Sequence, residues 1–350
     1  MTSLDEIRTI LTQHPQIKII DAHCHLNHES VNENETGKPV ESLASILAVM
    51  STQIDEFSKV SKLMITSPGI IGAFGLHPWF SHHVYDDSSL QTKLQHYQAV
   101  LVPSSKSFSK VVDWPRIIAD LPEPMPLTKF KSILKEILLR HPKALIGECG
   151  LDKSYRVIPR NAQGPITFNI SMEHQKLILC AQLEIALGLD RALSIHGVNC
   201  HGALYELLMR MSADGRNPLK VCLHSYSGPP SFLANYFPKR SNSGTNSHNI
   251  KAYLSLSYQI NYTDDPRRWA TFSELLNAVP ANRILIESDY HGITLSENED
   301  KVLSDEKQNQ FMENIIKKIS EGKEWELGAA LSRFYDNWMG FTGETDQKCS

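Results

Sequence analysis

Eight short apolar runs, rich in β-branched residues, recur along the chain, and segments with helical periodicity separate most of them. The runs occupy 17–23, 44–50, 69–76, 143–148, 191–196, 219–224, 251–257 and 283–288. Eight strands that alternate with helices are the number that closes a parallel (β/α)8 barrel. The sequence therefore predicts an α/β fold of the TIM-barrel class.

Other segments fit or interrupt this alternation. Residues 127–140 place their apolar side chains on one stripe and 171–187 behave similarly, so we expect two helices that face the core. The alternation breaks at 26–43, at 241–249 and above all at 79–126, which is too long for a simple βα loop. We interpret 79–126 as an insertion on the barrel rim, within a single domain that spans 1–350.

Composition excludes some classes of protein. The net charge of −4 argues against a protein that coats nucleic acid non-specifically. No apolar run approaches the roughly 18 residues of a membrane span, so we expect no membrane association. The six cysteines form no CxxC pair and no regular framework, which predicts reduced thiols and a location in the cytoplasm or the nucleus.

The first apolar run ends in Asp21-Ala22-His23-Cys24-His25. On a strand His23 and His25 point the same way and Cys24 points away. Two convergent imidazoles make half of a metal site. Asp21, two residues earlier, is expected either to orient an imidazole or to accept hydrogen bonds from the backbone.

Further histidines and carboxylates fall at the ends of the other predicted strands. They are His77 in GLHPW, Glu148 in GECGLD, His196, His224 in LHSYSG and Asp289 in IESD. In a (β/α)8 barrel the carboxyl ends of the strands form one face, so these side chains are expected to converge there. The pattern predicts a metal centre.

The number of candidate ligands exceeds what one tetrahedral ion takes, which favours two divalent ions that share a bridging carboxylate and activate a bridging water. We expect Glu148 to be the bridge and also a catalytic residue. One ion would add His23, His25 and Asp289, and the other would add His196 and His224. Asp289 is further predicted to act as the general base. The ligand set leaves Mg, Mn and Zn open.

Substrate contacts are expected on the same face. His77 is predicted to contact a substrate phosphate or to lie in the outer shell of the metal centre. Lys153 and Arg156 follow the fourth strand, and either form part of a rim for an anionic substrate or are ordinary solvated cations. The aromatic residues Trp79, Phe80, Tyr155 and Tyr226 lie near the same strand ends, where they are candidates for stacking on single-stranded bases.

Several motifs together carry a resemblance to a known family. They are DAHCHL, GLHPW, GECGLD, HQKLILCAQLEIALGLDRALSIH, LHSYSG and ILIESD, which extend from about Ile17 toward the C-terminus. With them the sequence resembles the TatD-like metal-dependent hydrolases, a deoxyribonuclease branch of the amidohydrolase-like barrels. The resemblance implies two divalent ions and hydrolysis of phosphodiester bonds, often in DNA. It assigns His23, His25, Glu148 and Asp289 to one ion, and Glu148, His196 and His224 to the other.

The sequence also departs from the family pattern. Gly197-Val198 follows His196 where the family often has Ser-Arg, and Ser288 stands where it usually has Thr. The insertion after GLHPW and the VNCHGAL stretch resemble the fungal branch, some members of which are described as partners of the anaphase-promoting complex. Two alternatives therefore stand beside a DNA phosphodiesterase: a hydrolase of another ester or amide, and a protein-interaction scaffold.

Overall fold

The structure is a computed structural model and describes residues 3–27, 42–88, 90–104, 112–159, 166–213, 217–238, 249–262, 265, 267–295, 302–303 and 306–343. No helix within these ranges has the length and apolar character needed to cross a membrane.

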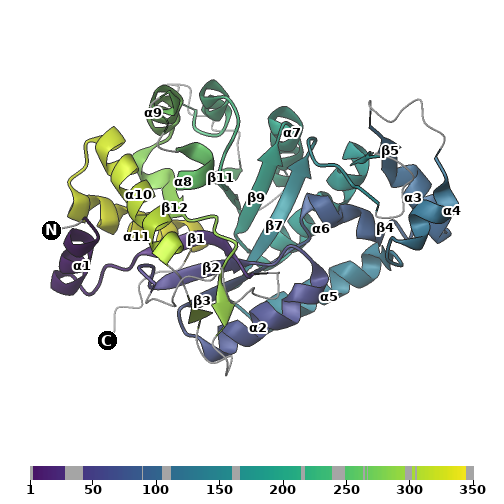
Figure 1. Cartoon of the computed structure of the whole chain (residues 1–350), viewed down its shortest axis with the longest axis horizontal. Coiled ribbons are helices and arrows are strands. Elements are labelled where there is room, and N and C mark those ends of the chain that lie inside the picture. The colour runs from purple at the N-terminus through teal and green to yellow at the C-terminus, as the bar shows by residue number, and fades with distance from the viewer. Residues whose placement is uncertain are drawn as a thin grey trace.

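A parallel sheet of eight strands curls into a nearly closed barrel (Figure 1). In sheet order its strands are β1 (Ile20–His25), β2 (Ile46–Met50), β3 (Ile70–Phe74), β7 (Leu145–Asp152), β9 (Leu193–Val198), β10 (Leu219–Leu223), β11 (Ile250–Ser257) and β12 (Ile284–Glu287). Where the chain leaves β12, the backbone N–H of Asp289 donates to the carbonyl of His23 at 3.0 Å. Each of the eight predicted strands overlaps one of these, so the predicted fold class is confirmed.

Helices follow most of the strands and cover the outside of the barrel. The longer ones are α1 (Ser3–Gln13), α2 (Phe57–Thr66), α5 (Leu127–Arg140), α6 (Met172–Leu189), α7 (His201–Ser212), α9 (Arg268–Ala278), α10 (Glu306–Lys323) and α11 (Leu327–Thr342). The short ones are η1 (Ile54–Glu56), η3 (Pro230–Asn235), α8 (Tyr258–Asn261) and η4 (Ala281–Arg283). The predicted helices 127–140 and 171–187 are confirmed as α5 and α6. A separate pair of two-residue strands is formed by β13 (Thr294–Leu295) and β14 (Val302–Leu303).

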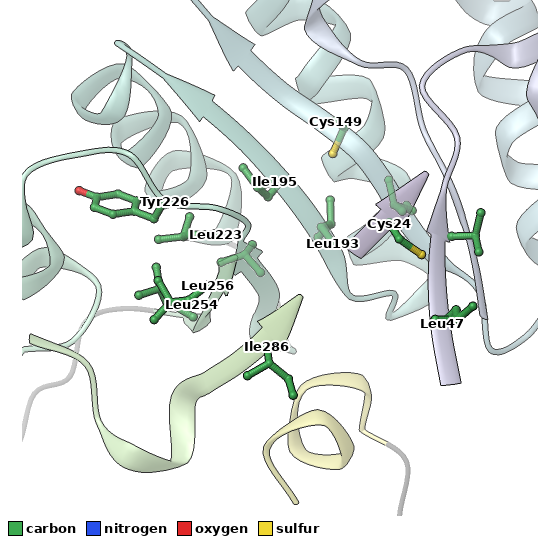
Figure 2. Close-up of a cluster of buried hydrophobic side chains, with 14 of the residues drawn as sticks. Cys24, Leu47, Cys149, Leu193, Ile195, Leu223, Tyr226, Leu254, Leu256 and Ile286 are labelled. Atoms are coloured by element: carbon green, nitrogen blue, oxygen red, sulfur yellow. The ribbon is translucent and has the colours of Figure 1, made fainter. Parts of the chain in front are cut away.

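Two layers of apolar side chains hold the barrel together. Side chains between strands and helices form the outer layer; Figure 2 shows part of it, including Leu47, Leu193, Leu254 and Ile286. Inside the barrel a second cluster contains Ile20, Ala48, Ala73, Leu145, Cys222 and Leu285, and Trp338 and Phe341 of α11 join it. This inner cluster leaves one end of the barrel interior to polar side chains.

The predicted rim insertion forms several short elements. They are η2 (Pro78–His83), β4 (Val84–Tyr85), α3 (Lys93–Val100), β5 (Leu101–Pro103), α4 (Trp114–Ala119) and β6 (Met125–Pro126). β5 pairs antiparallel with β8 (Phe168–Ile170), which lies outside the insertion in the sequence. Tyr97, Ile117 and Phe168 belong to a small apolar cluster of this region. Figure 1 shows α3, α4 and β5 together, on the opposite side of the molecule from α1. The other two predicted interruptions lie mostly at 28–41 and 239–248, outside the described residues.

Candidate metal centre

A register shift in β1 decides which way the first two histidines point. Between Asp21 and Cys24 the pairing with β2 shifts, so that Asp21 and Cys24 both lie opposite residues of the outer layer. His23 and His25 consequently point into the barrel, and their Nε2 atoms lie 3.1 Å apart. A bulge of this kind re-aims side chains beside an active site. The predicted convergence of the two imidazoles is confirmed.

Asp21 has the second of its two expected roles. Its carboxylate accepts hydrogen bonds from the backbone N–H of Ser288 at 2.9 Å, from the Ser288 hydroxyl, from the side-chain amide of Gln308 at 2.9 Å and from the backbone N–H of His23 at 3.3 Å. Simple alternation would place Asp21 on the same face as His23, and the register shift is the reason that it does not lie there. Asp21 therefore holds β1 against β12 and α10. Its burial raises the pKa of the carboxyl to about 6.

A second register shift, in β7 between Ile146 and Cys149, aims Glu148 into the barrel. Cys149 is buried in the outer layer, and its thiol pKa is raised by burial. Gly150 has φ of 152°, and a Cβ added there would lie 2.0 Å from the carbonyl oxygen of His196. Only glycine fits this close approach of β7 to β9.

The two carboxylate oxygens of Glu148 face different imidazoles. Oε2 lies 3.5 Å from Nε2 of His23 and 3.4 Å from Nε2 of His25. Oε1 lies 2.9 Å from Nδ1 of His196 and 2.9 Å from Nε2 of His224. A carboxylate that turns one oxygen to each group of nitrogens has the geometry of a bridge between two ligand sets.

His77 lies against the candidate bridging carboxylate, a position that fits the expected outer shell of the metal centre. It follows β3, and its Nε2 atom is 3.2 Å from Oε1 of Glu148. Its Nδ1 atom accepts a hydrogen bond from the backbone N–H of Trp79 at 3.2 Å, which fixes the ring. His77 is thus placed as a fifth imidazole of the cluster.

Asp289 completes the cluster from the end of β12. Its Oδ1 atom lies 3.8 Å from Nε2 of His25. Its φ of 51° is a left-handed conformation, and Ser225 beyond β10 has φ of 38°. Both residues turn the chain sharply at the strand ends, at a cost of about 1–3 kcal/mol each that the surrounding packing must offset. Such outliers concentrate at functional sites.

Glu287 supports His224 from behind. The carboxylate is fully buried and accepts hydrogen bonds from the backbone N–H of Ser225 at 2.7 Å, from the Ser225 hydroxyl at 2.6 Å and from the hydroxyl of Ser255. Its Oε1 atom lies 3.5 Å from Nδ1 of His224. Sequence reasoning missed this residue, although its position two residues before Asp289 on β12 was a signal for the same face of the strand.

Asp152 was also missed, and it has the corresponding position beside His196. Its Oδ2 atom lies 3.2 Å from Nε2 of His196 and accepts a hydrogen bond from the indole N–H of Trp79 at 2.6 Å. The predicted strand ended at 148, whereas β7 continues to Asp152 and so brings this carboxylate to the site.

His291 is not among the predicted site residues, but it lies beside one of them. Its ring stacks on that of His25, with centroids 4.1 Å apart and planes at 12°. The side chain is 62% exposed, and its Nε2 atom lies 3.9 Å from Oδ1 of Asp289. It lies at the edge of the cluster.

Burial and mutual proximity shift the pKa values of these groups. Burial lowers the pKa of His77 to about 4 and lowers that of His25 well below its usual value. Burial alone would raise the pKa of Glu148, but the surrounding imidazoles, led by His77 and His224, hold it well below its ordinary value. Burial would lower the pKa of His224 and His196 as well, but Glu148 raises that of His224 well above its usual value, and Asp152 and Glu148 raise that of His196. At neutral pH Glu148 is therefore ionised and His25 and His77 are neutral, whereas a metal ion that binds His224 must displace a proton from it.

The side chains of this cluster form three groups that could hold a metal ion. Three groups of side chains each bring one ligand atom per residue to within 4.8 Å of the others: His23 with Glu148 and His224, His23 with His25 and Asp289, and His77 with Glu148 and His196. Imidazole nitrogen combined with carboxylate oxygen suits divalent zinc, manganese or iron. The residues present fit a divalent metal.

The two predicted basic contacts lie outside this cluster. Lys153 is exposed on the loop after β7. The guanidinium of Arg156 is exposed and donates to the carbonyls of Lys153, Ser154 and Tyr155 in its own loop.

The sequence matches a known protein family over most of its length. Residues 20–339 match the family model described as TatD related DNase, which covers more than half of the chain. The protein belongs to the TatD family. The family resemblance is confirmed, and the protein is a hydrolase acting on ester bonds in a family whose members use divalent metal ions.

Two fungal relatives match nearly the whole length of this TatD-family hydrolase. The Cut9-interacting protein scn1 of Schizosaccharomyces pombe is 30% identical over 92% of this chain and 98% of its own. An uncharacterized deoxyribonuclease of Saccharomyces cerevisiae is 28% identical over 93% of this chain and 99% of its own.

Solved structures share the fold at low sequence identity. A TatD homolog from Escherichia coli aligns with a TM-score of 0.57 and 16% identity, covering 93% of this chain and 98% of that one. A TatD-family hydrolase from Entamoeba histolytica aligns with a TM-score of 0.57 and 14% identity over 94% and 99%.

Proposed function

We propose that this TatD-family protein is a phosphodiesterase that hydrolyses DNA, with two divalent metal ions held around Glu148. The arrangement of the two Glu148 oxygens carries the proposal, because each oxygen faces its own pair of imidazoles. The choice of DNA is supported by the name of the budding yeast relative, a deoxyribonuclease.

Each ion would have its own set of ligands. His23, His25 and Asp289 would bind one ion, and His196 and His224 the other, while Glu148 would contribute to both. The Nε2 atom of His77 lies near Oε1 of Glu148, the oxygen that also faces His196 and His224, so His77 would lie beside the second ion. When bound, two such ions lower the pKa of a water molecule and stabilise the charge of a phosphoryl group under attack.

The chain itself supplies the base. Asp289 is mostly buried, with 13% of its side chain exposed, and this burial raises the pKa of its carboxyl. A carboxylate with a raised pKa is a better proton acceptor than an ordinary one near neutral pH. We therefore assign to Asp289 the removal of a proton from the attacking water.

Substrate binding is assigned to the loops around the same barrel end. Lys153 and Arg156, on the loop after β7, provide positive charge at the edge of the site for the phosphates of a strand. Contacts of this kind weaken as salt concentration rises. Binding of DNA that did not change with ionic strength would contradict this assignment.

The proposal is tested with single-stranded DNA labelled at one end, incubated with the purified protein and Mg²⁺ or Mn²⁺. We expect nucleotide release by the natural sequence and its loss in Asp289→Asn. Asp190→Asn is the matched control, because Asp190 follows α6 at the opposite end of the barrel and has φ of 52°, which asparagine tolerates. Two bound metal equivalents without DNA cleavage would indicate another ester or amide as the substrate. No turnover and no bound metal would favour a scaffold.

A protein partner is the second candidate function. The fission yeast relative is named for its interaction with Cut9, and the match with this chain covers 98% of that relative. We propose a corresponding partner-binding role in the cytoplasm or nucleus. Titration of the purified protein with purified fission yeast Cut9 tests it. Micromolar or tighter binding is expected, and the absence of binding at higher concentration would count against this role.

A further inference from the structure

Two aromatic rings stack at the edge of the metal centre. Trp79 lies in η2, which follows β3, and Tyr155 lies in the loop after β7. Their ring centroids are 4.7 Å apart and their planes meet at 12°. Trp79 is 37% exposed, and every other Phe, Tyr and Trp in the described part of the chain is less exposed than this. An exposed tryptophan beside a buried polar cluster needs an explanation other than core packing.

The stack is held in place by a single carboxylate, Asp152. Its Oδ2 atom accepts a hydrogen bond from the indole N–H of Trp79 at 2.6 Å. Its Oδ1 atom accepts hydrogen bonds from the backbone N–H of Tyr155 at 3.0 Å and from that of Ser154 at 2.6 Å. Both rings are therefore ordered before any ligand arrives, which reduces the entropy lost when something binds to them.

The same contacts join the stack to the candidate metal ligands. Asp152 reaches Nε2 of His196 at 3.2 Å, and the backbone N–H of Trp79 donates to Nδ1 of His77. The Trp79 ring lies edge to face with that of His77, with centroids 4.7 Å apart, and its centroid is 6.1 Å from that of His196. A group stacked on these rings would lie next to whatever is bound at Glu148.

We propose that Trp79 and Tyr155 form the subsite for the nucleobase next to the cleaved phosphate, so that the enzyme requires an unpaired nucleotide there. The inference rests on the proposed function and adds the class of substrate. A base has a flat π face that adds to an ordered aromatic stack, and stacking of this kind tolerates any base sequence. Within a duplex both faces of a base are already covered, so the subsite selects single-stranded or frayed ends.

The test uses two pairs of single-stranded oligonucleotides, one pair for each end of the strand. In each pair one member carries a normal terminal nucleotide and the other an abasic one. The natural sequence is expected to cleave the normal member with a kcat/KM about tenfold higher than the abasic member, from the usual strength of base stacking. In Trp79→Ala this preference disappears because cleavage of the normal member falls by about tenfold more than that of the abasic member.

Two controls accompany this test. Trp79→Phe keeps a ring and is expected to keep part of the preference. Trp269→Phe makes the same change on α9, where Trp269 packs on Tyr262 and Phe272, and is expected to keep all of it. Metal content and melting temperature are measured for each variant, to show that Trp79→Ala folds and keeps its ligands.

The outcomes separate this inference from the proposed function. Equal cleavage of normal and abasic oligonucleotides by the natural sequence, or an equal loss on both in Trp79→Ala, overturns the nucleobase subsite and leaves phosphodiester hydrolysis intact. No cleavage of any oligonucleotide or of bis(p-nitrophenyl) phosphate overturns the proposed function, and the subsite with it.

Discussion

Glu287 Oε1 lies 3.5 Å from Nδ1 of His224, while Nε2 of the same ring lies 2.9 Å from Oε1 of Glu148. The imidazole therefore stands between two buried carboxylates, one in the metal centre and one behind it. A carboxylate in this outer position fixes the orientation and tautomer of the ring and increases its basicity as a ligand.

The first prediction concerns this outer carboxylate. Glu287→Gln keeps the shape of the side chain but removes its charge, so the affinity for a divalent ion is expected to fall by roughly 10–100-fold. Competition with a fluorescent chelator measures the affinity. Glu274→Gln, an exposed change on α9, is the matched control and should bind metal like the natural sequence. An unchanged affinity in Glu287→Gln would show that Glu287 does not tune His224.

Periodicity predicted the barrel and the polar side chains at its strand ends because each parallel strand is a short apolar run. The register shifts in β1 and β7 left no mark that alternation could reveal, since a bulge adds a residue without changing composition. For that reason Asp21 was expected on the face of His23, where it does not lie.

The supporting carboxylates were harder to predict than the ligands. Asp152 depends on how far β7 continues, and its two contacts, His196 and Trp79, come from distant parts of the sequence. His77 was expected to contact substrate or to lie in the outer shell, and a residue before Pro78 gives no indication of how deeply the following turn is buried. Only the packed structure brings its ring to Glu148.

The second prediction uses two glycines. Gly150→Ala forces a Cβ to within 2.0 Å of the His196 carbonyl at a φ of 152°, so the free energy of unfolding is expected to fall by at least about 2 kcal/mol. Gly188→Ala is the control, because nothing lies within 4 Å of a Cβ built there in α6. It should stabilise the protein by about 0.5–1 kcal/mol. Denaturant unfolding measures both, and equal effects would contradict the prediction.

The third prediction concerns pH. His174 in α6 is buried, its Nε2 donates to the carbonyl of Ser81 at 3.0 Å, and burial lowers its pKa to about 4. In the unfolded chain the ring takes up a proton near its ordinary pKa of about 6.5, so between these values the unfolded state binds more protons. Stability therefore falls as the pH is lowered through this window, and His174 accounts for a loss of about 2 kcal/mol between pH 7 and pH 5.

Replacement of His174 by Gln tests this, because Gln retains an N–H donor but does not titrate. Urea unfolding of both proteins is followed from pH 7 to pH 5 with EDTA present, so that metal binding does not contribute. The curve for His174→Gln is expected to fall less steeply than that of the natural sequence. Parallel curves would show that His174 titrates with the same pKa in the folded and unfolded states, and a steeper fall in the His174→Gln curve would show that the buried ring is protonated.

The last prediction concerns metal removal. Oε2 of Glu148 and the Nε2 atoms of His23 and His25 lie 3.1–3.5 Å from one another. A cation bound between them would interact with all three atoms at once. An ion that binds only the folded state at about 100 times its Kd stabilises it by about 2.7 kcal/mol. For a chain of this size that corresponds to a rise in Tm of about 4 °C when Mn²⁺ or Zn²⁺ is added after EDTA treatment.

Glu148→Gln should lose most of this rise, because both ligand sets lose their shared charge. Glu184→Gln, an exposed change on α6 that removes an ion pair with Lys131, should retain all of it. Differential scanning calorimetry with and without metal measures the three proteins. A full rise in Glu148→Gln would mean that the ions bind elsewhere, and a rise of about half would mean that only one of the two sets depends on the Glu148 charge.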